Sequence, residues 1–140
     1  PIFEKMRFYE ERPSFYVLNT GETHYPYATP EESENDWPRI HGVNGVFKHL
    51  DDHLRAGKLV QDSHRWFDDQ KMEELRQRQI AAVRWVDRAC EELFDRVPDN
   101  TWITVTADHG DLFGEEGYFG HGPINHEKVM EVPFVEGLIR

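Results

Sequence analysis

The sequence predicts an α/β fold with a mostly parallel sheet flanked by helices. Residues 101–107 contain the β-branched run Thr-Trp-Ile-Thr-Val-Thr, and residues 14–20 form an aromatic and apolar run. Both runs are typical of buried strands. Between them, residues 68–97 carry apolar side chains at three- and four-residue spacing, which predicts a long helix. A helix that connects two strands of one sheet favours a right-handed crossover, so we expect the two strands to be parallel neighbours or near neighbours.

The long helix has recognisable ends. Asp68 is a residue type that caps helix N-termini, and Pro98 cannot continue a helix. Cys90 falls on the apolar face of this helix, which predicts a buried thiol rather than a nucleophile.

The shorter elements are predicted from apolar spacing. Residues 2–11 have the pattern of a short amphipathic helix that ends before Pro13. Residues 43–57 have the same helical spacing, with a glycine beyond the last apolar position. A helical turn is expected at about 125–130, and a strand at 132–135, where the internal proline favours an edge or an early strand position.

The strongest functional signal is the end of the second predicted strand. Asp108 and His109 follow it directly, and a glycine-rich loop comes next. In open α/β sheets, ligands bind beyond the carboxyl ends of the strands. A carboxylate beside an imidazole suits a divalent metal ion, so Asp108 and His109 are predicted metal ligands. Adjacent strand residues point to opposite faces, so both can reach one ion only if the chain leaves the strand at Asp108. We expect Gly110 to permit that bend.

The first predicted strand ends in a similar way, with His24 in the loop after it. Two strands that each end in a histidine-bearing loop suit one shared site at the edge of the sheet. The alternative for His24 is a hydrogen-bonded loop histidine. A second histidine pair, His49 and His53, is spaced by one helical turn and could bind a metal. Acidic neighbours indicate an exposed face there, so we do not expect a site.

Composition limits the classes of function. The chain has 140 residues and 38% hydrophobic content, enough for one modest core, so we expect residues 1–140 to form a single partial domain. The net charge of -11 argues against a nucleic-acid partner and opposes anionic substrates unless a metal ion reverses the local field. The single cysteine excludes a Cys-rich zinc site. No signal peptide and no apolar run of about 18 residues is visible, so we expect no membrane partner and a cytoplasmic location.

Four spaced pieces of the sequence resemble the sulfatase branch of the alkaline phosphatase superfamily. They are Asp-His-Gly at 108–110, Leu-Phe-Gly-Glu-Glu-Gly at 112–117, Phe-Gly-His-Gly-Pro at 119–123 and Glu-Val-Pro-Phe-Val at 131–135. The family's usual forms are Ser-Asp-His/Asn-Gly-Glu, Leu-Gly-Glu-His-Gly, Gly-(Lys or His)-Gly and Arg-Val-Pro-Leu-Ile. The resemblance is specific because all four pieces agree in order.

Two further segments add to the resemblance. His24, Pro26 and Tyr27 match the last part of the family's Asp-Pro-His-x-Pro-Tyr, with Glu and Thr in place of the first two residues. Trp85-Val-Asp87 is similar to a Tyr-Val-Asp that the family carries in a long helix.

The resemblance implies a partial alkaline-phosphatase-like domain that acts in metal-dependent hydrolysis of sulfate or phosphate esters. It implies that Asp108 and His109 bind a divalent ion (manganese, zinc, calcium or magnesium), and that His24 and His121 are catalytic groups that contact the substrate's anion or donate protons. His121 stands where the family has Lys or His. His126 stands where many relatives have Tyr, and its role stays open. Glu115 is expected to stabilise the glycine-rich turn as an acceptor.

The family's nucleophile, in Cys/Ser-x-Pro-x-Arg or as a Thr, has no counterpart here, and no Asp precedes His24. The resemblance therefore covers the second half of the catalytic domain only. Two hypotheses follow. The chain is a fragment or split half of a hydrolase, which a complementing chain or a homo-oligomer completes. Alternatively, it is a catalytically inactive stand-alone domain that binds a metal or a protein partner.

Overall fold

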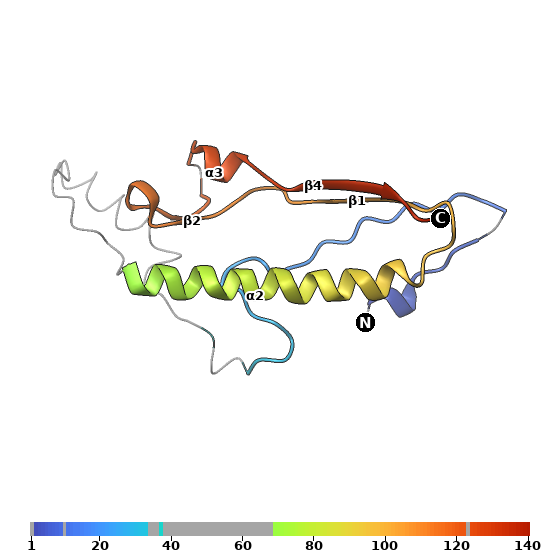
Figure 1. The fold of residues 1–140 in the computed structure, drawn as a ribbon, viewed down its shortest axis with the longest axis horizontal. Helices are drawn as coiled ribbons and strands as arrows, with labels where there is room; N and C mark the ends of the chain where they lie inside the picture. Colours follow the sequence, from blue (N-terminus) through green and yellow to red (C-terminus); the bar gives the residue numbers. More distant parts are fainter. Residues whose placement is uncertain (1, 10, 34–36, 38–68, 123) are drawn as a thin grey trace.

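The computed structural model of the chain describes residues 2–9, 11–33, 37, 69–122 and 124–140. The helix predicted at 43–57, the His49/His53 pair and the Asp68 cap lie outside these residues. The described elements, shown in Figure 1, are η1 (Ile2–Lys5), α2 (Asp69–Phe94), β1 (Trp102–Thr106), β2 (Leu112–Phe113), η4 (Glu115–Gly117), β3 (Phe119–Gly120), α3 (Glu127–Met130) and β4 (Phe134–Leu138).

The long helix predicted at 68–97 is confirmed as α2. Its buried side chains are Met72, Leu75 and Ala82, which follow the predicted three- and four-residue spacing. The second half of the same stripe, which includes Cys90, is only partly buried. The helix ends at Phe94, and the chain turns before Pro98, which could not have continued it.

The strands predicted at 101–107 and 132–135 are present as β1 and β4, but they pair antiparallel. Trp102 lies opposite Leu138, and Thr106 lies opposite Phe134. Between the two strands the chain passes through the β2–β3 hairpin and α3 at one end of the molecule and then returns (Figure 1). Because β4 comes back along the path of β1, it must run in the opposite direction. The prediction of a mostly parallel sheet is not confirmed, since both sheets among the described residues are two-stranded and antiparallel.

The prediction of a strand at 14–20 is wrong, because the structure assigns no strand to these residues. This segment is extended and runs in the same direction as β1 in Figure 1, but no described residue forms a strand ladder with it. Phe15 is 90% exposed and Val17 is 78% exposed. An apolar run favours an extended backbone, but a strand forms only where a neighbour supplies the ladder's donors and acceptors. The same exposure corrects the expected burial of β1, in which only Ile103 is partly buried. The amphipathic helix predicted at 2–11 is also shorter, since η1 is the only helical part among the described residues of this range.

The core lies at the end of the molecule that carries the histidine loops. Tyr27, Met72, Leu75, Ala82 and Phe119 form one buried cluster, with Tyr25 and Phe113 packed against it. The cluster joins the loop after residue 20 to α2 and to the β2–β3 hairpin, in which Leu112 pairs with Gly120. Burial of apolar surface is the main favourable contribution to folding, so this core fixes the loops on which the predicted site residues stand. None of the described helices is both long and apolar enough to cross a membrane.

Candidate active site

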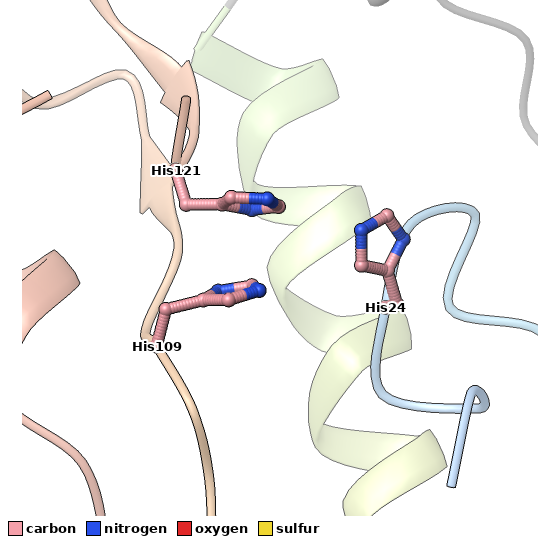
Figure 2. Close-up of side chains that lie close together, drawn as sticks. All are labelled: His24, His109 and His121. Atoms are coloured by element: carbon pink, nitrogen blue, oxygen red, sulfur yellow. The ribbon is translucent and has the colours of Figure 1, made fainter. Parts of the chain in front are cut away.

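Three of the four predicted site residues lie together. His24, His109 and His121 each offer a ligand nitrogen, and these nitrogens all lie within 4.8 Å of one another. The rings of His109 and His121 are stacked with centroids 3.6 Å apart, and the His24 ring meets that of His121 edge-on at 5.4 Å. Figure 2 shows His109 and His121 pointing from one side toward His24, which points back from the loop on the other side. The fold thus joins the loop of His24 to the two sides of the β2–β3 hairpin, a region about 85 positions later in the sequence.

Each of the three imidazoles has its Nδ1 atom beside an oxygen. Nδ1 of His24 lies 2.9 Å from the Tyr25 carbonyl oxygen, and Nδ1 of His109 lies 3.0 Å from that of Gly110. Carbonyl oxygens only accept hydrogen bonds, so both Nδ1 atoms carry the proton. Nδ1 of His121 donates in the same way to Oδ1 of Asp111 at 2.9 Å. In a neutral imidazole the lone pair is then on Nε2.

Asp111 is a further residue of the candidate site, and it was not among the predicted site residues. Its side chain is only 5% exposed, and it accepts hydrogen bonds from His121, from the Tyr27 hydroxyl at 2.8 Å and from the Gln79 amide at 3.4 Å. Asp111 stands where the family's Ser-Asp-His/Asn-Gly-Glu has Glu, so the motif offered a signal for an acidic residue at this position. Burial, and then the neighbouring Asp111 carboxylate, raise the pKa of Tyr27 far above its usual value. The hydroxyl therefore stays protonated and continues to donate to Asp111.

Asp108, the other predicted metal ligand, lies at the edge of the cluster. Its side chain is 93% exposed, and its Oδ1 lies 3.7 Å from Nε2 of His109. The strand β1 ends at Thr106, so the chain has already left the sheet and the two side chains need not point to opposite faces. Whether both bind one ion stays a prediction.

Gly110 is needed for a reason other than the predicted bend. Its N–H donates to the Val129 carbonyl at 2.9 Å, which brings α3 against the loop. A Cβ atom at Gly110 would lie 2.0 Å from the carbonyl oxygen of Lys128. The backbone of Lys128 therefore approaches Gly110 too closely for any side chain, which explains why glycine occupies this position.

Two other residues named in the motifs have structural roles. Glu115 accepts hydrogen bonds from the Phe113 N–H and from Lys128 Nζ at 2.6 Å, which confirms it as a stabilising acceptor. Partial burial alone raises the pKa of Glu115, but the hydrogen bonds from Lys128 and Phe113 outweigh burial and leave the pKa below its usual value. His126 is the N-cap of α3, where its Nδ1 accepts from the Lys128 N–H at 3.1 Å.

Cys90 has the properties of an inert thiol. It is half-buried on α2, and burial followed by the charge of Asp87 raises its pKa. A raised pKa keeps the thiol protonated at neutral pH, and the protonated form is a poor nucleophile.

Comparison with known protein families identifies the chain. The sequence model of the family described as Sulfatase matches residues 4–135. The chain belongs to the sulfatase family. This confirms the resemblance of the four motif pieces, and the matched residues include all three clustered histidines. Sulfatases are hydrolases of sulfate esters, and they generally use a divalent metal ion. No curated protein and no solved structure matched this sulfatase chain.

Proposed function

We propose that this sulfatase chain supplies one half of a metal-dependent active site that hydrolyses sulfate or phosphate esters. Asp108 and His109 contact the ion, and His24 and His121 contact the anionic group of the substrate or donate a proton to the leaving group. The nucleophile comes from a segment that this sequence does not include.

The observation that carries the proposal is the convergence of three histidines, one from the loop after residue 20 and two from the ends of the β2–β3 hairpin. Histidine side chains placed this close are unfavourable neighbours when protonated, because like charges repel. Their hydrogen bonds to Tyr25, Gly110 and Asp111 hold them in this arrangement nevertheless. His24 is exposed, while His109 and His121 are partly exposed, so a small anion can reach all three imidazoles from solvent.

The charge of the chain supports a role for the ion. A net charge of -11 repels a sulfate ester at long range. A divalent cation held by Asp108 and His109 would reverse the field locally and would supply positive charge to stabilise the charge that develops on the substrate. The donor set is compatible with such an ion, since Asp108 offers a carboxylate oxygen 3.7 Å from an imidazole nitrogen.

Exposed apolar side chains support the view that another chain completes the domain. Phe15 is 90% exposed on the 14–20 segment, Trp102 is 61% exposed on β1, and Phe134 is 65% exposed on β4. A stable protein usually covers such a surface, and either a complementing segment or a second copy of the chain would do so. No Cys, Ser or Thr stands in the family's nucleophile context, so we expect the completing segment to carry it.

Turnover and binding measurements test this proposal. The chain alone, with Mn²⁺ or Zn²⁺, should not turn over 4-nitrophenyl sulfate or phosphate, but the metal-loaded chain should bind 4-nitrophenyl sulfate in calorimetry. We expect His24→Ala and His121→Ala to weaken ester binding. The matched control is Arg76→Ala, which removes an exposed positive charge on α2 that is paired with Glu73.

Two results would count against the proposal. Turnover by the chain alone that disappears in Asp108→Ala would show a complete active site and contradict the split-half reading. Ester binding that is unchanged in both histidine variants, or that falls equally in Arg76→Ala, would remove the role of the cluster and favour an inactive domain.

A further inference from the structure

We infer that Asp111 is a positioning residue for the proposed reaction, because it holds the imidazole of His121 in the tautomer that carries its proton on Nδ1. Nε2 is then the nitrogen that meets the substrate, and any proton that His121 exchanges with the substrate passes through it. The inference rests on the proposed function, which gives His121 this contact. The side chain of Asp111 is only 5% exposed, so Asp111 acts through His121 and does not touch the substrate itself.

The carboxylate of Asp111 uses its two oxygens for different partners. Oδ1 lies 2.9 Å from Nδ1 of His121. Oδ2 accepts from the Tyr27 hydroxyl at 2.8 Å and from the Gln79 amide at 3.4 Å. An ionised carboxylate can only accept hydrogen bonds, and a buried one is costly unless donors surround it. It therefore favours the His121 tautomer with a proton on Nδ1, since the other tautomer would point a lone pair at an oxygen.

The two donors on Oδ2 are themselves held in place. Burial, and then the charge of Asp111, raise the pKa of Tyr27 far above its usual value, so the hydroxyl stays a donor. The amide nitrogen of Gln79 also lies 3.5 Å from the Thr23 carbonyl oxygen. Both neighbours of this nitrogen are acceptors, so the NH₂ group of Gln79 lies there and not its carbonyl oxygen. Oδ2 consequently faces two donors, which holds the carboxylate in this orientation and leaves Oδ1 for His121.

The same hydrogen bonds connect His121 to the loop of His24. Tyr27 closes that loop, because its N–H donates to the His24 carbonyl at 2.7 Å, and Thr23 directly precedes His24. Tyr27 has a φ of 58°, a left-handed conformation that is rare for a bulky residue, and packing holds it there with 1% of its surface exposed. Asp111 therefore joins the two predicted catalytic histidines through one network. Groups that are oriented before the substrate arrives need no reorganisation during the reaction.

Asp111→Asn tests the inference with almost no change of volume. An amide has one accepting oxygen and one donating NH₂ group. We expect the oxygen to stay toward Tyr27 and Gln79, because two donors meet it there, and the NH₂ group then faces His121. Nδ1 must accept from this group, so the ring should change to the tautomer with its proton on Nε2. The ratio of the two tautomers should change by about tenfold or more, the effect of one hydrogen bond to a charged group.

Long-range ¹H–¹⁵N spectra of the metal-free chain distinguish the two tautomers, and His121→Ala identifies the His121 signals. At about pH 8.5, where an ordinary imidazole is neutral, the wild type should carry the proton on Nδ1 and Asp111→Asn should carry it on Nε2. Tyr27→Phe/Asp111→Asn removes the stronger donor on the far side, so the amide can turn its oxygen to His121. Nδ1 should then regain the proton. A purely structural role for Asp111 predicts no such rescue, because the double variant loses more contacts than the single one.

Glu115→Gln is the matched control. It makes the same chemical change at a carboxylate of the neighbouring turn, which accepts from Phe113 and Lys128, and it should keep the wild-type tautomer of His121. A wild-type His121 with its proton on Nε2, or an Nδ1 proton that persists in Asp111→Asn, would overturn the inference. The wild-type spectrum is decisive by itself, so the test does not depend on the folding of a variant.

Addition of 4-nitrophenyl sulfate to the Zn²⁺-loaded chain separates this inference from the proposed function. The ester should shift the Nε2 signal of His121 more than its Nδ1 signal, and a larger shift at Nδ1 would contradict the inference. The expected tautomers in every variant, without any shift on addition of the ester, would contradict the proposed contact with the substrate and support the hold of Asp111 on His121.

Discussion

The hydrogen bond between Tyr27 and Asp111 offers a clean test of how the histidine cluster is held. Tyr27 is 1% exposed, and its hydroxyl donates to Oδ2 of Asp111 at 2.8 Å. Tyr27→Phe keeps the ring and its packing against Phe113 but removes this donor. From the part of the chain that the structure describes, the buried Oδ2 then keeps only the 3.4 Å contact from Gln79.

The expected cost follows from the charge and burial of the acceptor. A hydrogen bond to a charged group contributes about 1.5–3 kcal/mol to stability, and the side chain of Asp111 is too buried for water to replace it. We therefore expect Tyr27→Phe to lower the free energy of unfolding by about 1.5–3 kcal/mol. With a urea dependence of about 2 kcal/mol per molar, the unfolding midpoint should fall by about 1 M.

The matched control is Tyr9→Phe, the same change at a side chain that is 51% exposed and whose ring contacts Arg12. Urea unfolding at pH 7 should place this control within about 0.5 kcal/mol of the wild type. A Tyr27→Phe midpoint equal to that of Tyr9→Phe would refute the reasoning, because it would mean that Asp111 does not depend on this donor.

The pH dependence of the difference provides a second check. The pKa of Tyr27 is raised above its ordinary value of 10.0 by burial and by Asp111. The stability linked to the neutral hydroxyl is fully present below pH 10 and is lost as the pH rises toward the folded-state pKa. The wild type should therefore have a higher free energy of unfolding than Tyr27→Phe between pH 7 and 9. This difference should shrink above pH 10.

Two further predictions concern the loop around the cluster. Gly110→Ala should destabilise the chain by at least about 1–3 kcal/mol, because its Cβ would lie 2.0 Å from the Lys128 carbonyl and force α3 away. Gly137→Ala, where no atom lies within 4 Å of the new Cβ, is the control, and equal melting temperatures would show that α3 yields freely. The lowered pKa of Glu115 predicts stability that is present above the ordinary value of 4.5 and is lost as the pH falls through the folded-state pKa. Glu115→Gln should flatten this acid dependence in thermal melts, and an unchanged acid profile would contradict the role of the Lys128 contact.

The local elements and the identity of three cluster residues could be predicted from the sequence. Apolar spacing and Pro98 predicted α2, because a helix buries one stripe of side chains whatever it packs against. The β-branched residues predicted β1. His24, His109 and His121 were recognisable because they stand in segments that resemble family motifs, and the family match confirms the family. The metal and catalytic roles of these residues, and the single partial domain over 1–140, stay predictions.

The pairing of strands and the hydrogen bonds within the site were decided only by the tertiary structure. A strand's direction and its partners depend on the path of the connecting chain, so the apolar pattern alone could not foresee that β4 returns antiparallel to β1 or that residues 14–20 lack a ladder partner. The contacts of Asp111 were decided by folding, which brought Tyr27, Gln79 and His121 to one carboxylate. Contacts between residues 32 and 84 positions apart leave no periodic trace in a sequence, because periodicity records which face of an element is buried and not which atoms meet there.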